Sequence, residues 1–391
     1  MFPEPVPRIF GLPPGADFAR EVVTGIRQRM QAQPASAAAS LHLIVPTERL
    51  RAALVAAFVA AGPGYLPRIE TLPDLAGASD DGPEMERVLQ IARLVRHLLG
   101  AHPGRSPPTA ALGLAQSLAA LADEMAEEGV ASTALRALDV ADHAAHWQTA
   151  LQFLTAAAPW IDADDGPGRR LSAAVAARIA LWAAHPPADP VLVVGSTGSR
   201  RSTAELMAAV ARLPQGAVIL PGYDADDLRA DSEGAEPQVG DDHPQARFLR
   251  FLARFDSGTV RPWTAAAPPD PGRNRLVSMA LLPAPVTDTW RREGAALPGT
   301  ALDRVTLIEA PGPRAEALAV ARALAEARAA GRRAALVTPD RMLARRVGVA
   351  LDRWRIVPDD SAGRPLRQSA PARLLRLIAQ RIAGDAGAVP L

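Results

Sequence analysis

One turn, with the sequence GSTGSR, carries the residue types best suited to binding a phosphate group. It follows the apolar run VLVV at residues 191–194 and precedes a stretch that favours a helix from Ser202 or Thr203. A β-branched run bounded by glycine is typical of a strand buried on both faces of a parallel sheet, and such sheets bind ligands beyond the carboxyl ends of their strands. Amides and hydroxyls placed there form an anion site. The candidate ligands are Gly195, Ser196, Thr197, Ser199 and Arg200.

A second glycine-bearing loop, GLPPGAD, follows a short apolar run at residues 8–11. A P-loop needs G-x-x-x-x-G-K-[ST], in which amides, the Lys and the hydroxyl hold phosphate and magnesium. Here Gly11 and Gly15 are one residue too close together, and Ala16 and Asp17 stand where the Lys and the hydroxyl residue belong. Two prolines between the glycines remove amide donors. We interpret Gly11 and Gly15 as part of a degenerate nucleotide site in a structural loop.

The composition excludes several kinds of chemistry. All 43 basic residues are arginine, and there is no cysteine. The first fact excludes Schiff-base catalysis and the P-loop lysine, and the second excludes thiolate catalysis, disulfides and cysteine-ligated iron–sulfur clusters. The formal net charge is +1, so only local arginine patches are expected to bind a phosphate backbone. With 391 residues, 48% of them hydrophobic, the chain is long enough for two or three folded domains.

The hydrophobic pattern predicts an α/β protein of several parts. Apolar runs predict strands at residues 8–11, 41–45, 66–75, 191–194 and 215–220 of a first parallel sheet. Apolar stripes of helical period fill residues 84–185, and a β-α-β-α order with strands at 304–309 and 333–338 predicts the start of a second sheet. The predicted parts are the first core (1–82 and 188–262), a helical insertion (83–187), a linker (263–302) and a second core (303–391).

Acidic and histidine side chains in the helical block give a third candidate, a metal hydrolase. Asp139, Asp142, His143 and His146 include two histidines on one helix face. We favour a helix start with acids at its positive end, because no third ligand can be identified, and we predict no metal site. We interpret a second acidic group in the same way, as a solvated helix face and a helix end and not as a carboxylate site. Its residues are Asp123, Glu124, Glu127 and Glu128.

The N-terminal sequence has no basic segment followed by an apolar core, and no apolar run is long enough to span a bilayer. These features predict a cytoplasmic protein without a membrane partner.

Several strings in a fixed order resemble one family. They are IFGLPPGADF, LIVPTERL, LLPRIETLPDLA, GSTGSRRSTAELMAAVARLPQGAVILPG, DHPQARF, RLVSMALLPAPVTD and EAPGPRAEALAVARALAEA followed by GRRAALVTPDRMLARRV and PDDSAGRPL. Together they resemble the AddB family, the helicase-like subunits of AddAB helicase–nucleases, in the variant without a Walker A loop. The resemblance covers essentially the whole chain. It implies an inactivated superfamily I helicase-like core with an all-helical insertion, followed by a second α/β core.

The resemblance also implies that ATP hydrolysis is lost. Where the superfamily has the Asp-Glu pair that holds magnesium and activates water, this chain has Gly195 and Ser196. The next strand ends in PGYD, with Gly222 and Asp224 but no Gln at the spacing of a γ-phosphate sensor. In the second core, Thr338 takes the place of a nucleotide-contacting Arg, with Arg341 one turn further on.

Members of this family carry a C-terminal nuclease domain with a magnesium site and an iron–sulfur cluster held by four cysteines. A chain without Lys or Cys contains neither, so we expect no cofactor and no catalysis here, and we expect this chain to be the N-terminal part of a longer nuclease subunit. The resemblance implies an AddA-like helicase–nuclease partner in a heterodimer, single- and double-stranded DNA as ligands, and a role in double-strand break repair and recombination.

The implied DNA channel runs past the ends of the strands. The residues expected to line it are Thr47, Glu48, Arg49, Arg68, Thr71, Arg341 and Arg345. Arginines there would hold phosphates. The alternative interpretation, solvated helix faces, stays open.

Overall fold

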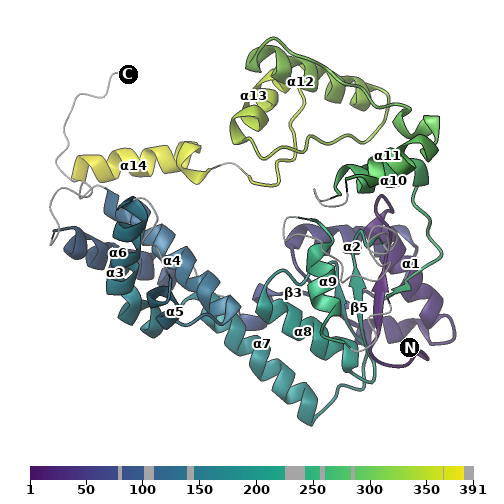
Figure 1. Ribbon diagram of the computed structural model, residues 1–391, viewed down its shortest axis with the longest axis horizontal. Coiled ribbons are helices and arrows are strands. Elements are labelled where there is room, and N and C mark those ends of the chain that lie inside the picture. The colour runs from purple at the N-terminus through teal and green to yellow at the C-terminus, as the bar shows by residue number, and fades with distance from the viewer. Residues whose placement is uncertain are drawn as a thin grey trace. The chain divides into compact units, whose positions relative to one another are not determined.

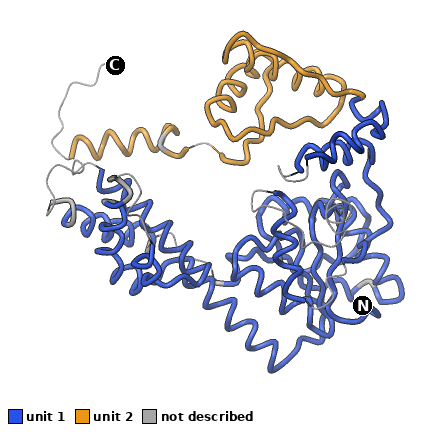
Figure 2. The backbone as a smooth tube through the Cα atoms, viewed as in Figure 1, with its two compact units in different colours: residues 1–302 blue, residues 303–391 orange. Residues whose placement is uncertain are grey.

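The computed structural model describes residues 1–77, 82–100, 110–138, 145–224, 243–255, 260–282, 287–363 and 365–382. The chain divides into two compact units, Met1–Leu302 and Asp303–Leu391 (Figure 2). The division falls where the sequence predicts the second core to begin. No described helix is apolar enough over a sufficient length to cross a bilayer.

Unit 1 is built on a six-stranded parallel sheet, which confirms the predicted α/β class. The strands are β1 (Ile9–Gly11), β2 (His42–Val45), β3 (Arg68–Thr71), β4 (Val191–Val194), β5 (Gly216–Leu220) and β6 (Arg261–Pro262), in the order β3-β2-β4-β5-β1-β6. The central strands β4 and β5 are buried along their whole length. That burial explains why the sequence shows them as unbroken apolar runs.

Helices cover both faces of the sheet (Figure 1). On one face, α1 (Phe18–Met30) and α2 (Glu48–Ala60) pack on Leu192, Val194 and Ile219. On the other face, α7 (Pro167–Ala184), α8 (Arg201–Arg212) and α9 (Ala246–Leu252) pack on Val193 and Val218. Alternate residues of each strand thus serve two separate cores.

The described residues between β3 and β4 form a helical block. Its helices are α3 (Gly82–Gly100), α4 (Ala111–Glu128), α5 (Thr133–Arg136), α6 (Ala145–Ala163) and α7. Apolar faces of α3, α4 and α6 share a core that includes Ile91, Ala115 and Ile161. Helix α7 packs on α4 through its first half and on the sheet through Val175 and Trp182, so it ties the block to the sheet.

The segment predicted as a linker, residues 263–302, includes a buried aromatic side chain and helices in its described part. Trp263, directly after β6, is 1% exposed, lies edge-on to Phe10 with 5.1 Å between ring centroids, and donates its Nε1 hydrogen to the Val22 carbonyl at 3.2 Å. The Arg29 guanidinium stacks 3.8 Å from the Trp263 ring. The chain continues through α10 (Pro271–Ala280) and α11 (Thr289–Glu293). A Pro- and Ala-rich composition indicated a spacer, but one large aromatic side chain anchors the segment in the core.

Unit 2 contains α12 (Pro313–Ala329), α13 (Arg341–Leu351) and α14 (Ala370–Ile382), and no strand among its described residues. The strands predicted at 304–309 and 333–338 are therefore wrong. Leu307 is 85% exposed and Val337 is 93% exposed, so neither segment has the hydrogen-bonded neighbours and the buried face that a strand needs. Helices α12 and α13 pack through Ala321 and Val347.

Six 3-10 helices complete the described secondary structure. They are Ala35–Ser40, Pro73–Ala76, Gly294–Ala296, Gly299–Leu302, Asp352–Trp354 and Leu366–Gln368.

Replacing Trp263 by Ala is expected to lower the free energy of unfolding by about 3–5 kcal/mol, because the ring fills space against Phe10 and over Gly25. Trp290→Ala is the matched control, since Trp290 is half-exposed, and a loss of roughly 1 kcal/mol is expected there. Urea denaturation followed by circular dichroism measures both. Equal losses would show that residue 263 is not an anchor of unit 1.

Candidate functional site

The carboxyl edge of the sheet is the expected place for a ligand. The chain leaves β1 towards α1 on one face of the sheet, and it leaves the neighbouring strand β5 towards α9 on the other face. Loops that part in this way open a crevice between them, and ligands of open parallel sheets bind there. The turns after β1, β4 and β5 therefore decide what this edge can hold.

The loop after β1 is closed by side chains from later in the chain. Gly15 has a φ of +82°, and a Cβ added there would lie 3.2 Å from Cδ of Pro269. Asn274 donates from Nδ2 to the Pro14 carbonyl at 2.9 Å. Asp17 caps α1 by accepting a hydrogen bond from the Arg20 amide at 3.3 Å. Because these contacts fill and fix the loop, the position of a P-loop has a structural role here.

The turn after β4 is closed in a similar way. Gly195 has a φ of +77°, and a Cβ added there would lie 2.5 Å from Cδ2 of Leu50 and 3.1 Å from Cε1 of Phe18. The Gly195 amide donates to the Ile219 carbonyl at 3.0 Å, and the Gly198 amide donates to the Ser196 hydroxyl at 3.3 Å. Two of the predicted ligand groups, the Gly195 amide and the Ser196 hydroxyl, thus already have partners within the protein.

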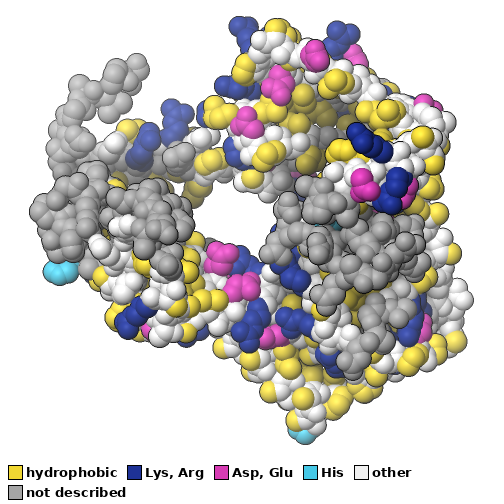
Figure 3. All heavy atoms as spheres, in the orientation of Figure 1, with side chains coloured by type: hydrophobic (Ala, Val, Ile, Leu, Met, Phe, Trp, Pro, Cys, Tyr) yellow, Lys and Arg dark blue, Asp and Glu magenta, His cyan; other side chains and the backbone are white. Residues whose placement is uncertain are grey.

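The start of α8, which follows this turn, contacts carboxylates of the helical block. The Arg201 amide lies 3.4 and 3.3 Å from the two carboxylate oxygens of Glu128. Arg200 Nε lies 3.0 Å from the Glu127 carboxylate. Basic and acidic side chains lie next to one another on this face near α7 and α8 (Figure 3). The predicted anion site therefore already contacts two anionic groups of the same chain.

These contacts correct the prediction of a solvated face at Glu127, whereas α4 ends at Glu128 and Glu124 is exposed, as predicted. The Glu127 side chain is 16% exposed. Burial raises the pKa of Glu127 above its ordinary value, against the opposing effect of Arg200, and the nearby carboxylates of Asp123, Glu128 and Glu124 raise it further.

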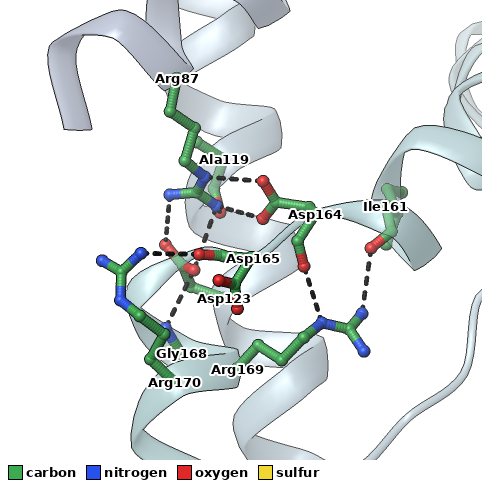
Figure 4. Close-up of polar contacts among 9 residues, drawn as sticks. All are labelled: Arg87, Ala119, Asp123, Ile161, Asp164, Asp165, Gly168, Arg169 and Arg170. Carbon is green, nitrogen blue, oxygen red and sulfur yellow. Dashed lines mark hydrogen bonds and ion pairs between the residues drawn. The ribbon is translucent and has the colours of Figure 1, made fainter. Parts of the chain in front are cut away.

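Asp123 is also engaged, one turn earlier on α4. The Arg87 guanidinium faces the carboxylates of Asp123, at 3.1 Å, and Asp164, at 2.7 and 2.9 Å (Figure 4). The Gly168 amide donates to the same Asp123 carboxylate at 3.1 Å. Burial alone would lower the pKa of Arg87, but the hydrogen bonds to Asp164 and Asp123 raise it above its ordinary value. This cluster joins α3, α4 and the start of α7 and has a structural role.

A pocket of about 390 Å³ lies beyond the carboxyl ends of β4 and β5. Its lining residues are Thr197, Pro221, Gly222, His243, Pro244, Gln245, Arg247 and Phe248. Gln245 fixes its wall, donating from Nε2 to the Gly222 carbonyl at 2.9 Å and accepting at Oε1 from the Asp224 amide at 3.3 Å. His243 accepts at Nδ1 from the Gln245 amide at 3.2 Å. Arg247 is exposed at the pocket.

Gln245 was missed from the sequence. No Gln stands at the expected spacing after Gly222 and Asp224, but the structure brings Gln245 to those two residues from 21 positions beyond Asp224. The string DHPQARF contains this Gln, but its distance along the chain from Gly222 gave no indication that the two residues are in contact.

The predicted DNA-contacting residues of unit 1 do not all lie on this edge. Thr47 caps α2, with its hydroxyl accepting from the Leu50 amide at 3.2 Å, and Arg49 is exposed in the same turn. Thr71 is buried at the end of β3, where its amide donates to Asp74 at 2.7 Å. Arg68, in contrast, begins β3 and pairs with Glu70.

Arg68 therefore lies at the amino edge of the sheet, about 10 Å from Thr71 along the strand. The structure therefore places Arg68 at the opposite edge of the sheet from Thr47 and Thr71, because Arg68 is the first residue of β3 and Thr71 the last. His42 at the start of β2 also bonds Glu70, with 2.7 Å between His42 Nε2 and a carboxylate oxygen. Burial lowers the pKa of His42, even though Glu70 opposes it. This is a closed polar cluster at the edge opposite the pocket.

In unit 2, Arg341 begins α13 and pairs with Asp360 at 3.0 Å and with the Gly363 carbonyl at 3.3 Å. Arg345, one turn later, is exposed. Thr338 accepts a hydrogen bond from the Asp340 amide at 3.0 Å, in the turn before α13.

The candidate metal site around His143 and His146 lies largely outside the described residues. Asp139, Asp142 and His143 belong to the part that is not described, and His146 lies in α6. Within the described ranges, no group of three or more His, Asp or Glu side chains is placed to hold a metal ion.

Comparison with known proteins adds no identification. No family model matches the chain, and no curated protein matches it.

Closure of the turn after β4 can be tested at Gly195. Gly195→Ala is expected to destabilise the fold by roughly 1 kcal/mol from its positive φ, and by a further 1–3 kcal/mol from the approach to Leu50 and Phe18. Gly222→Ala is the matched control, since Gly222 has a φ of +58° and open space around it. Thermal unfolding of both variants measures the difference. Equal losses would mean that Leu50 and Phe18 do not close the turn.

Proposed function

We propose that this chain is a helicase-like α/β part of an AddB-like subunit, which binds DNA without hydrolysing ATP. In this proposal it acts with an AddA-like helicase–nuclease subunit, in the cytoplasm, in the end resection of double-strand breaks. The order of elements supports it: three strands, a helical block, and three more strands of the same parallel sheet. Magnesium and iron–sulfur chemistry would belong to the nuclease domain of the longer subunit.

Loss of ATP chemistry is supported by the closed turns. Pro269 and Asn274 fill the loop after β1, and Leu50 and Phe18 approach the turn after β4. No carboxylate stands at the end of β4, where Gly195 and Ser196 replace the metal-binding and water-activating pair. Phosphoryl transfer depends on a positioned metal ion and on cationic and hydrogen-bonding groups that hold the phosphates, and the described turns after β1 and β4 lack the P-loop lysine and the carboxylate pair.

The observation that carries the DNA-binding proposal is the pocket beyond β4 and β5. It combines the hydroxyl of Thr197, the imidazole of His243 and the guanidinium of Arg247 at the edge where parallel sheets bind ligands. Arginine and hydroxyl groups are the usual partners of phosphate oxygens in nucleic-acid complexes. The pocket is open beside exposed Arg247, so a single strand of DNA could pass along it with its phosphates towards this side chain.

Binding of fluorescent oligothymidine of about twenty nucleotides, measured by anisotropy at low salt, tests the proposal. Arg247→Glu is expected to weaken binding about tenfold, because it reverses a charge at a phosphate contact. Arg254→Glu is the matched control: Arg254 is exposed two turns further along the chain and lies outside the pocket lining. It should change affinity less than about twofold.

Labelled ATP with magnesium provides the second arm of this test. The proposal predicts no saturable ATP binding and no DNA-stimulated hydrolysis. Saturable ATP binding without DNA binding would instead support the alternative, a nucleotide-binding α/β protein that uses the GSTGSR turn.

A further inference from the structure

The contact between α4 and α8 joins an anionic helix end to a cationic helix start. Helix α4 ends with Glu127 and Glu128, and α8 begins with Arg201, directly after Arg200. The N-terminus of a 12-residue helix such as α8 carries a partial positive charge. Two oxygens of Glu128 lie 3.3 and 3.4 Å from the Arg201 amide, and Glu127 lies 3.0 Å from Arg200 Nε. The two carboxylates thus occupy the positions at which a phosphate would contact the Arg201 amide and the Arg200 guanidinium.

A second feature of this helix start points to an anion. The Ser202 hydroxyl, in the same first turn of α8, is buried and has no hydrogen-bond partner among the described residues, and Ser202 is only 4% exposed. A buried hydroxyl without a partner is unfavourable, and an added acceptor would relieve it. Glu128 already engages the neighbouring amide, and Arg201 Nε is held 2.8 Å from Glu205 on the same helix.

We propose that Glu127 and Glu128 are a built-in competitor for phosphate at the start of α8. A phosphate group, either inorganic or in a DNA backbone, then binds Arg200 and the first amides of α8 only when these carboxylates withdraw. The inference that DNA phosphates bind here rests on the proposed function, whereas the inference that inorganic phosphate binds here does not. The consequence for the protein is that the helical block controls access to the turn after β4.

The geometry allows the carboxylates to leave. They are the last two residues of α4, and Gly129 follows in the left-handed conformation with a φ of +66°, so no helix continues beyond them. The two Glu128 contacts are at the long end of the hydrogen-bond range. Burial raises the pKa of Glu127 against the opposing effect of Arg200, and three nearby carboxylates raise it further, which weakens the preference of Glu127 for this position as an anion.

The test compares the wild-type chain with the double variant Glu127→Gln, Glu128→Gln. Phosphate affinity is measured by calorimetry, and oligothymidine affinity by anisotropy at low salt. Both affinities should rise roughly three- to tenfold in the variant, because two competing charges are removed. Glu124→Gln is the matched control. Glu124 is exposed on the same helix and has the same charge, and no contact with α8 is seen for it, so the gain should stay below about twofold.

A further pair of substitutions assigns the gain to this site. Arg200→Gln with Arg201→Gln, added to the double glutamine variant, should abolish the gain in phosphate affinity. A gain that survives these changes would overturn the proposal, and so would a double glutamine variant that binds phosphate no better than the wild type.

Hydrogen exchange of the wild-type chain serves if the double glutamine variant does not fold. Added phosphate should slow exchange in residues 200–204 and speed it in residues 126–129. Unchanged exchange at saturating phosphate would overturn the proposal. If phosphate changes the exchange rates as expected but oligothymidine does not bind, the proposal that Glu127 and Glu128 compete with phosphate is supported. The proposed DNA-binding function is then wrong.

Discussion

Strands β4 and β5 are buried on both faces, and the arrangement of unit 1 depends on this constraint. Their alternate side chains serve two cores, one beneath α1 and α2 and the other beneath α7, α8 and α9. A strand covered in this way offers no polar surface along its length, and ligands of such sheets usually bind beyond the carboxyl ends of the strands. The helical block is tied to the same sheet through α7, which brings the end of α4 to the start of α8.

At that carboxyl edge, the chain supplies its own partners for the groups that would bind a nucleotide. Pro269 and Asn274 close the loop after β1, Leu50 and Phe18 approach Gly195, and Glu127 and Glu128 engage the start of α8. A pocket bounded by Gln245 and Arg247 lies at the same edge.

The sequence predicts the sheet of unit 1 well, because the signal is local. Apolar runs such as 191–194 and 215–220 are bounded by glycine and proline, and the structure confirms parallel strands there. The failures concern contacts between residues far apart in the chain. Trp263 anchors a segment of linker-like composition, and Gln245 contacts Gly222 although it lies 23 positions further along the chain. In unit 2 the runs near Leu307 and Val337 have the pattern of strands but not the buried neighbours that make them strands.

Photo-crosslinking with an oligothymidine that carries iododeoxyuridine shows which segments of the chain bind DNA. Mass spectrometry of the crosslinked full chain locates the peptides that touch the DNA. We expect crosslinks in the segments after β4 and β5, at residues 195–200 and 243–250, unchanged by excess ATP with magnesium. Crosslinks confined to the amino edge around His42 and Arg68, or crosslinks that ATP removes, would contradict this expectation.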